Sequence, residues 1–261
     1  LAGELREFLA GQGADVCLCS AWDGQEARRL VDGTELLISI GGDGTILRAA
    51  QAVVPRRVPI TGINLGSLGF MTELTAAEAR SQLARLLAGE GWDDERALLE
   101  ARLRPPGAGQ EQTFYALNDV VISHGGVARL LRIEARIDGE LLTTYKADGV
   151  IVSTATGSTG YALAAGGSIL PPQSREMLLL PILPHLSATH RLVLAPGTVI
   201  GLRVGVLHAA SMTVDGHISA PTPDGTEVTV RLSQHTICFR RIHAGTTFYG
   251  SLEKRLKGKQ G

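Results

Sequence analysis

The sequence lacks the features that would place it in a membrane, on nucleic acid or outside the cell. Its 25 Lys and Arg residues are balanced by 26 Asp and Glu residues, so its net charge indicates no anionic partner such as nucleic acid. No apolar run approaches the roughly 20 residues that cross a bilayer. The first residues also lack the order of a secretory signal. We therefore expect a cytoplasmic protein that binds neither membrane nor nucleic acid.

Cysteine is equally scarce. The three cysteines are too few for a disulfide framework and lack the spacing of a zinc site, and the scattered histidines lack metal spacing as well. We predict buried thiols in a reducing cytosol, and no metal site made from protein ligands alone. The residues concerned are Cys17, Cys19, Cys238, His124, His208, His235 and His243.

The first 94 residues alternate between helical and strand patterns. Apolar residues recur at helical spacing near the N-terminus, and Thr75–Glu78 has the pattern of a capping box that opens another helix. Such alternation predicts a mostly parallel sheet covered by helices, with ligands at the carboxyl ends of the strands. The expected strands are residues 14–19, 36–40 and 58–64.

The pattern changes over residues 95–246. Strand-like segments there are separated by turn signals of the kind found in antiparallel hairpins, which predicts a second, β-rich domain. We expect residues 247–261 to form a short helical tail that packs back on the first domain. The strand-like segments are 97–103, 130–137 and 228–232, and the turn signals are Pro105–Gly107, Asp138–Gly139 and Asp224–Gly225.

A glycine-rich turn follows the second expected strand, in Ile38-Ser-Ile-Gly-Gly-Asp-Gly-Thr-Ile-Leu47. Glycines before a helix suit phosphate, because bare N–H groups can approach an anion closely, and Arg48 follows within a helical turn. The carboxylate of Asp43 instead suits a hydroxyl whose proton it would accept, or Mg²⁺ beside the phosphates. The structural alternative is a strand-to-helix turn in which Asp43 or Thr45 caps the helix. The turn is not a Walker A loop.

Two further blocks combine polar residues with strand patterns. Asn118 and Asp119 interrupt an apolar run, where either a structural hydrogen-bonded pair or a pair that holds a vicinal diol such as ribose would fit. Adjacent strand residues face opposite sides, so one of them points into the core unless a bulge or strand end intervenes. Asp148-Gly149 alone fits a hairpin turn. The stretch Thr154-Ala-Thr-Gly-Ser-Thr-Gly160 is too dense in hydroxyls and glycines to be explained easily as structure alone.

In this order, the blocks resemble the NAD kinase family. The matching stretches are GGDGTIL, GINLGSLGFMTEL, ALNDVVIS, LLTTYKADGVIVSTATGSTGYALAAGG, PILPH and VDGH. The resemblance implies a Rossmann-like, phosphofructokinase-like α/β domain and a C-terminal β-sandwich-like domain. It also implies a homodimer or homotetramer that binds NAD near the domain and subunit boundary. The implied reaction phosphorylates the 2′-hydroxyl of the adenosine ribose of NAD, with ATP or polyphosphate as donor and Mg²⁺ or another divalent cation.

The resemblance also implies roles for individual residues. Asp43 resembles the proton acceptor, with Gly44 beside it and Arg48 near the nucleotide, and Asn118 with Asp119 resembles the pair on the ribose. Phe70 is similar to an apolar wall for a base, and Asp148 to the acid that reads an amide or amino group of the dinucleotide. The remaining matches are the cleft-lining Arg129, Lys146 and His217, and the adenosine-contacting Thr159, Gly160 and Tyr161.

The sequence departs from the family pattern at several positions. Asp119 stands where Glu is usual, so the ribose contact shifts or passes through water. Ala155 and Gly160 replace the usual Pro and Ala, which loosens that turn, and Ala164 replaces a frequent Ser and removes one possible hydrogen bond to the ligand. The family's first strand would precede Leu1. We expect a sheet without that strand, or a chain whose start lies further upstream.

Two alternatives stay open from the sequence. Diacylglycerol kinases and phosphofructokinases share the GGDGT element, so a lipid or sugar kinase is the nearest alternative, although it would not need the later blocks. A dinucleotide-binding sensor without activity is the other, and it would bind NAD without forming NADP.

Overall fold

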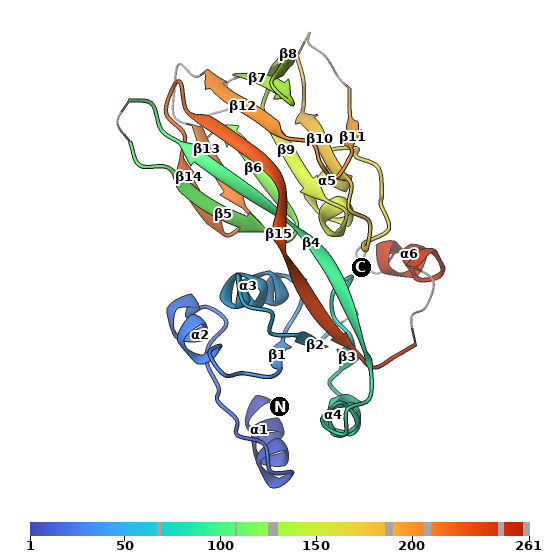
Figure 1. The fold of residues 1–261 in the computed structure, drawn as a ribbon. Helices are drawn as coiled ribbons and strands as arrows, with labels where there is room; N and C mark the ends of the chain where they lie inside the picture. The colour runs from blue at the N-terminus through green and yellow to red at the C-terminus, as the bar shows by residue number, and fades with distance from the viewer. Residues whose placement is uncertain are drawn as a thin grey trace. The chain divides into compact units, whose positions relative to one another are not determined.

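The structure, a computed structural model, describes residues 1–66, 69–107, 109–124, 130–185, 190–205, 210–244 and 248–257. The chain divides into two compact units, one comprising Leu1–Glu95 with Ile237–Gly261 and the other comprising Arg96–Thr236. The division falls within two long strands, β4 (Trp92–Arg104) and β15 (Glu227–Arg241) (Figure 1). None of the helices in these described ranges is both long and apolar enough to cross a membrane.

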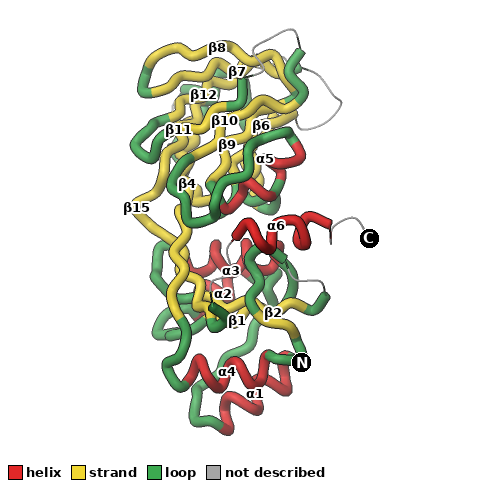
Figure 2. Tube along the Cα trace, turned by 90° about the vertical axis from the view of Figure 1, so that its right-hand side faces the viewer, coloured by secondary structure: helices red, strands yellow, loops and turns green. Residues whose placement is uncertain are grey.

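The first unit contains a small parallel sheet. β1 pairs in parallel with β2, β2 pairs with the short β3, and the end of β15 joins β2 through Phe239 and Ile60. Leu5, Leu9 and Leu83 share a core that ties α1 to α4, and these helices lie side by side (Figure 2). The elements are α1 (Ala2–Gly11), α2 (Gly24–Leu30), β1 (Leu37–Ile40), α3 (Asp43–Val53), β2 (Ile60–Asn64), β3 (Leu74–Thr75), α4 (Ala79–Leu87) and α6 (Phe248–Lys257).

The second unit is a sandwich of two sheets. One sheet runs in the order β11-β10-β9-β6-β13-β14, and the other includes β15-β12-β7-β8, with β4 beside β15 and β5 beside β4 (Figure 1). The elements are β5 (Gln112–Ala116), β6 (Asp119–His124), β7 (Leu131–Ile137), β8 (Glu140–Ala147), β9 (Gly149–Thr154), η1 (Thr156–Thr159), α5 (Tyr161–Ala164), β10 (Met177–Ile182), β11 (Leu192–Leu194), β12 (Ile200–Gly205), β13 (Ala210–Val214) and β14 (Ile218–Pro221).

The core of the sandwich is made by both sheets. Leu99 and Ile133 from one sheet, and Val152 and Met212 from the other, are buried in the same apolar cluster. Side chains alternate between this core and the opposite face, as expected for strands. The predicted combination of an α/β domain with a β-sandwich-like domain is confirmed.

The expected strand at residues 14–19 is wrong. The segment has no regular secondary structure, although Ala14 and Val16 still pack against the core of the first unit. A strand needs a hydrogen-bonded partner in a sheet, and β1 pairs with β2 instead. For the same reason the prediction of buried thiols fails at Cys17 and Cys19, which are exposed, and holds for Cys238, which is buried.

Turn chemistry was informative at Asp138-Gly139 and misleading at Asp148-Gly149. Asp138 and Gly139 join β7 to β8 with φ of 52° and 88°, the paired positive φ values of a type I′ hairpin turn. Asp148-Gly149 also separates consecutive strands, but β8 and β9 belong to different sheets. It is therefore not a hairpin turn. A Cβ on Gly149 would lie 2.4 Å from the carbonyl oxygen of Ile122, so close strand packing requires the glycine.

We predict that Gly139→Ala lowers the free energy of unfolding by about 1–2 kcal/mol, because an L side chain is strained at this positive φ. Urea unfolding measures the change. Gly3→Ala is the matched control, since Gly3 lies in α1 with nothing near its Cβ position and the substitution should leave stability unchanged or raise it slightly. A Gly139→Ala variant as stable as the wild type would contradict the hairpin geometry.

Candidate active site

Asp43 connects two loops of the first unit. It is the first residue of α3, and its Oδ2 and Oδ1 atoms accept hydrogen bonds from the backbone N–H groups of Phe70 and Met71, both at 3.0 Å. A Cβ on Gly69 would lie 2.2 Å from Oδ1, so the close approach of the loops depends on that glycine. Each carboxylate oxygen can accept more than one hydrogen bond. The half-buried Asp43 is therefore fixed in place and retains acceptor capacity.

The loop that faces Asp43 is organised by Asn64 and Thr72. The Oδ1 atom of Asn64 accepts the N–H of Gly66 at 2.7 Å, and its Nδ2 donates to Thr72 Oγ1 at 3.2 Å. The same Oγ1 accepts the N–H of Gly69 at 2.9 Å. Asn64 and Thr72 are both buried. This network holds the loop, and with it the two N–H groups that bind Asp43.

The glycine-rich turn does not use a side-chain cap. Gly42 occupies the N-cap position of α3, so neither Asp43 nor Thr45 is the N-cap residue. The carboxylate of Asp43 is directed to the neighbouring loop instead. Gly41 has φ of +150°, and a Cβ there would lie 2.3 Å from Thr45 Oγ1. The guanidinium of Arg48 lies 4.0 Å from the ring centroid of Trp22.

In the second unit, Asp215 binds the backbone that leads into β6. Its carboxylate accepts N–H groups from three consecutive residues: Leu117 at 3.0 Å, Asn118 at 2.7 Å and Asp119 at 3.3 Å. Asp215 is buried at the β13–β14 turn with φ of 50°, and its own N–H donates to the carbonyl of Asp119 at 3.0 Å. The backbone of the Asn118–Asp119 pair is thereby fixed.

Asn118 lies at a strand end, because β5 ends at Ala116 and β6 begins at Asp119. Its Oδ1 is buried, and no described residue gives it a hydrogen bond. A buried polar atom without a partner is costly and points to a ligand or water. A Cβ on Gly157 would lie 2.2 Å from the carbonyl oxygen of Asn118, and one on Gly160 would lie 3.5 Å from its Nδ2. The contact with Nδ2 at Gly160 is an ordinary van der Waals distance, whereas the one at Gly157 leaves no room for a side chain.

The hydroxyl-rich stretch after β9 has a structural explanation. Thr154 Oγ1 donates to the carbonyl of Leu117 at 2.6 Å and accepts the N–H of Gly157 at 3.0 Å. Ser158 Oγ donates to the carbonyl of Ala155 at 2.7 Å and accepts the N–H of Leu170 at 3.0 Å. These hydroxyls satisfy backbone groups in a buried turn. At the start of this stretch, the N–H of Thr154 also donates to the carbonyl of Asn118 at 2.9 Å.

Asp119 is a buried acid close to a second acid. Burial, together with the negative charge of Asp215, raises the pKa of Asp119 to about 7. His217 lies beside the pair, with Nδ1 3.0 Å from the carbonyl oxygen of Asp215. The described geometry of the second unit thus brings Asn118, Asp119, Gly160 and His217 together around the Asp215 turn.

The other predicted residues are distributed more widely. Lys146 is exposed near the end of β8, and Asp148 is half-buried with its N–H donating to the carbonyl of Ile182 at 3.0 Å. Thr159 is buried, whereas Tyr161 and Ala164 are exposed on α5. In the first unit Gly44 is exposed and Phe70 is half-buried, and Arg129 lies outside the described residues.

Comparison with known proteins identifies the chain. Residues 21–91 match the ATP-NAD kinase N-terminal domain, and residues 117–242 match the ATP-NAD kinase C-terminal domain. A NAD kinase of Dehalococcoides mccartyi is 43% identical over 99% of this chain and 91% of its own length. A NAD kinase of Chloroflexus aurantiacus is 39% identical over 98% and 93%. The chain belongs to the NAD kinase family.

Solved structures of the NAD kinase family agree with this assignment. A yeast NADH kinase in complex with NADH has a TM-score of 0.82 at 28% identity, covering 90% of this chain and 69% of the yeast chain. A NAD kinase of Archaeoglobus fulgidus in complex with ATP has a TM-score of 0.78 at 26% identity, covering 99% and 93%. The chain is thus an enzyme of the family that transfers phosphate to NAD, and the lipid or sugar kinase and the inactive sensor are set aside.

Sequence reasoning missed three residues that position candidate site residues, Asn64 and Thr72 in the first unit and Asp215 in the second. Asp215 attracted notice only as the residue before Gly216 and His217, and Asn64 and Thr72 were not singled out. Their partners are distant in sequence or are backbone groups. The available signal was a polar residue directly after an apolar strand, as at Asn64, and an Asp-Gly turn inside a strand-rich segment, as at Asp215.

We predict that Asp119→Asn raises stability relative to the wild type more at pH 7 than at pH 4. The raised pKa means that folded protein binds more protons than unfolded protein between about pH 4 and pH 7, so wild-type stability falls as pH rises through that window. The amide removes this titration.

Urea unfolding at several pH values measures the difference. Asp15→Asn, at an exposed acid, is the control and should show no such trend. A stability difference between Asp119→Asn and wild type that stays constant with pH would contradict the shifted ionisation.

Proposed function

We propose that this enzyme phosphorylates the 2′-hydroxyl of the adenosine ribose of NAD, with Asp43 as proton acceptor. The hydroxyl oxygen forms a bond to the terminal phosphorus of ATP or polyphosphate, the bond to the shortened donor breaks, and the hydroxyl proton passes to the Asp43 carboxylate. The supporting observation is that carboxylate itself, which is held by two N–H groups and half-exposed beside glycines. The archaeal relative solved with ATP supports a nucleotide donor.

Positioning favours Asp43 for this role. A sugar hydroxyl is a weak nucleophile at neutral pH, and an acceptor within hydrogen-bond reach typically contributes about 10²–10⁴-fold. The N–H groups of Phe70 and Met71 fix both oxygens. The carboxylate therefore has little rotational freedom left to lose when the hydroxyl binds. Mg²⁺ would enter with the donor phosphates and neutralise their charge, and the hard oxygen ligand that Asp43 offers fits it.

We further propose that Asn118 and Asp119 hold the ribose diol. The buried Oδ1 of Asn118, without a partner among the described residues, is an acceptor to which a ribose hydroxyl can donate. Asp119 supplies the second group. Its pKa of about 7 allows it to donate or to accept at neutral pH. Both residues are fixed through their N–H groups by Asp215.

The remaining family positions are proposed as nucleotide contacts. Lys146 and Arg48 would offset phosphate charge, and Asp148 would read an amide or amino group. Phe70, His217 and the turn around Tyr161 would contact the bases. Gly44, Arg129, Thr159, Gly160 and Ala164 complete the proposed set. We also infer a cytoplasmic homodimer or homotetramer, to be tested by light scattering.

We predict that Asp43→Asn lowers kcat for NADP formation by at least about 10²-fold and changes NAD affinity little, because the amide is not basic. Steady-state NADP formation and NAD binding by calorimetry are measured together. Near-normal turnover would remove Asp43 from the chemistry.

Thr72→Val separates the chemical role from the loop clamp. It removes the hydroxyl that accepts the N–H of Gly69 and the amide of Asn64 but leaves the carboxylate of Asp43 in place. We expect Thr72→Val to lose about as much stability as Asp43→Asn does. Its kcat should nevertheless stay far above that of Asp43→Asn. Equal loss of kcat in both variants would make Asp43 a structural clamp only.

We predict that Asn118→Ala lowers kcat/KM for NAD. The lost transition-state stabilisation should be about 1–3 kcal/mol, the cost of a lost buried hydrogen bond. Stability should change little, because no described residue bonds to the Oδ1 that is removed. Gln112→Ala, at an exposed position of β5, is the control. Unchanged kcat/KM, or a large loss of stability, would favour a purely structural Asn118.

A further inference from the structure

The outward face of three adjacent strands in the sandwich unit carries an unusual set of side chains. In β4 and β5, Glu100 pairs with Tyr115 and Arg102 with Thr113, so these four side chains share a face because residues two apart point the same way. β4 also pairs with β15, which contributes Arg231 and Ser233 to the same cleft. The alternating residues Leu99, Ala101, Leu103 and Val230 are buried in the core on the other side.

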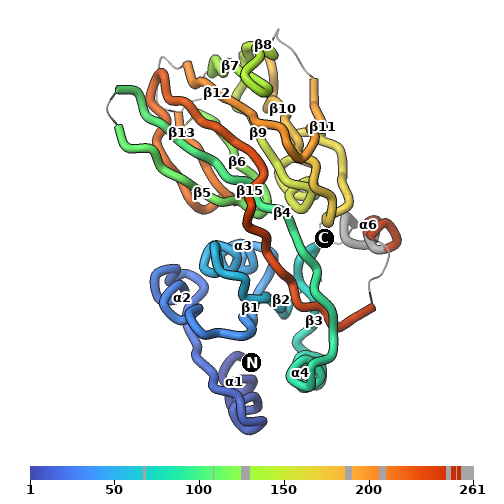
Figure 3. Tube along the Cα trace, viewed as in Figure 1, coloured from blue at the N-terminus to red at the C-terminus, as the bar shows by residue number. Residues whose placement is uncertain are grey.

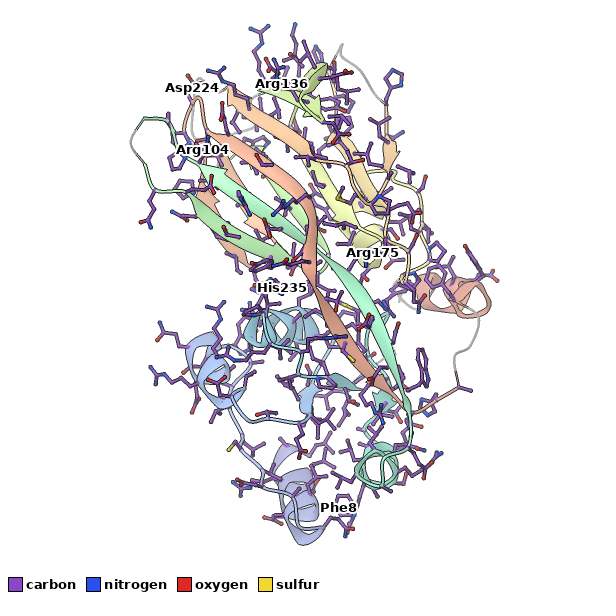
Figure 4. The ribbon with its side chains drawn as sticks, in the orientation of Figure 1. Phe8, Arg104, Arg136, Arg175, Asp224 and His235 are labelled. Atoms are coloured by element: carbon purple, nitrogen blue, oxygen red, sulfur yellow. The ribbon has the colours of Figure 1, made fainter. Side chains whose placement is uncertain are left out.

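These residues line a cleft of about 510 Å³. Among the described residues, its lining contains three arginines, Arg102, Arg175 and Arg231, and one acid, Glu100. The cleft therefore carries an excess of two positive charges. Figure 4 labels Arg175 and also His235, whose ring packs edge-to-face against Tyr115 with centroids 5.5 Å apart.

Glu100 lies deeper in the sheet face than Arg102 and Arg231 and holds these two arginines in place. Its side chain is 7% exposed, while those of Arg102 and Arg231 are 45% and 47% exposed. Oε1 of Glu100 accepts from Arg102 Nε at 2.9 Å and lies 2.8 Å from Arg102 Nη2, and it accepts from Arg231 Nε at 3.2 Å and Nη2 at 2.8 Å. A guanidinium has five N–H groups, so Glu100 leaves at least three of them on each arginine for another acceptor.

The third arginine adds charge without adding an ion pair. Arg175 is exposed, and no acidic partner is found for it within the part of the chain that the structure describes. Neutral donors also line the cleft. Ser233 Oγ accepts the N–H of His235 at 2.9 Å, which leaves its own hydrogen available, and Thr113 and Tyr115 contribute hydroxyl groups.

The structural alternative is a cross-strand charge network of the kind common on solvated sheet faces. Such a network balances its charges. Here one nearly buried carboxylate serves two guanidiniums, a third lies in the same cleft, and hydroxyl donors face the same space. Guanidinium forks match the oxygens of phosphate in geometry as well as in charge, and the volume is that of a small-molecule site.

We propose that this cleft binds a compact anion that carries two or more phosphoryl groups. Arg102 and Arg231 bind it with the N–H groups that Glu100 leaves unused, and Arg175 adds the third positive charge. The site lies within the second unit and involves none of the residues assigned to phosphoryl transfer. It provides a place where a phosphorylated metabolite binds without occupying those residues.

Calorimetric titration of the full chain with tripolyphosphate tests the proposal. Arg175→Gln and Arg231→Gln should each weaken binding at least tenfold. Arg136→Gln is the matched control: Arg136 is similarly exposed, pairs with Glu134 at 2.8 Å, and lies on the β7–β8 hairpin well away from Arg175 (Figure 4). It should bind within twofold of the wild type. Equal affinity in all four proteins, or no binding by the wild type at low millimolar tripolyphosphate, would overturn the site.

Two further readouts keep the result specific. Arg175→Gln should form NADP, without tripolyphosphate, within about twofold of the wild-type rate, and its melting temperature should be unchanged. Parallel loss of NADP formation would place the arginine in the catalytic machinery and overturn a separate site. Tripolyphosphate would also enter the proposed donor site beside Asp43, so the binding assigned to the cleft is the part that Arg175→Gln and Arg231→Gln remove. Tighter binding of citrate than of tripolyphosphate would overturn the phosphoryl preference.

Discussion

The Asp215 carboxylate, bound to three consecutive backbone N–H groups, is the interaction on which the proposed ribose site depends. Residues at a strand end lack ladder partners, and their N–H groups would otherwise need water. One carboxylate satisfies all three and fixes the direction in which Asn118 and Asp119 leave the backbone. The β13–β14 turn can present it because Asp215 adopts a positive φ, which Asp tolerates better than most residues.

The first unit uses the same device twice. Asp43 accepts two N–H groups from the neighbouring loop, and Glu73 Oε1 accepts those of Ile242 at 2.9 Å and His243 at 2.8 Å. Glu73 also pairs with the buried Arg241, which in turn pairs with Asp94. Buried charges persist when several groups satisfy them. Carboxylates bound to backbone amides therefore join segments that are distant in sequence, and one of them is also the proposed base. In the same unit, α2 and α3 lie side by side (Figure 3).

The sequence predicted what local physics controls. Apolar periodicity located β1, β2 and α1, and the Asp138-Gly139 turn followed from its φ requirement. The strand at 14–19 failed because a strand is completed by a partner that periodicity does not reveal. Asp148-Gly149 failed because the same dipeptide serves a hairpin turn or a crossing between sheets. The bond from Asp215 to Asn118 could not be predicted, since its partners are backbone groups almost a hundred residues away.

The pairing of Asp119 with Asp215 gives the proposed ribose site a property that neither residue has alone. Asp215 is surrounded by donors, whereas burial beside that charge raises the pKa of Asp119 to about 7. A vicinal diol offers both donors and acceptors, and a neutral carboxyl group can match both, while an ionised one only accepts. The buried Oδ1 of Asn118 adds a fixed acceptor at the same place. The carboxyl group of the shorter acid lies beside Asp215, where a pKa of about 7 lets it donate or accept at neutral pH. Burial and charge therefore set the hydrogen-bonding pattern toward a sugar as much as the length of the side chain does.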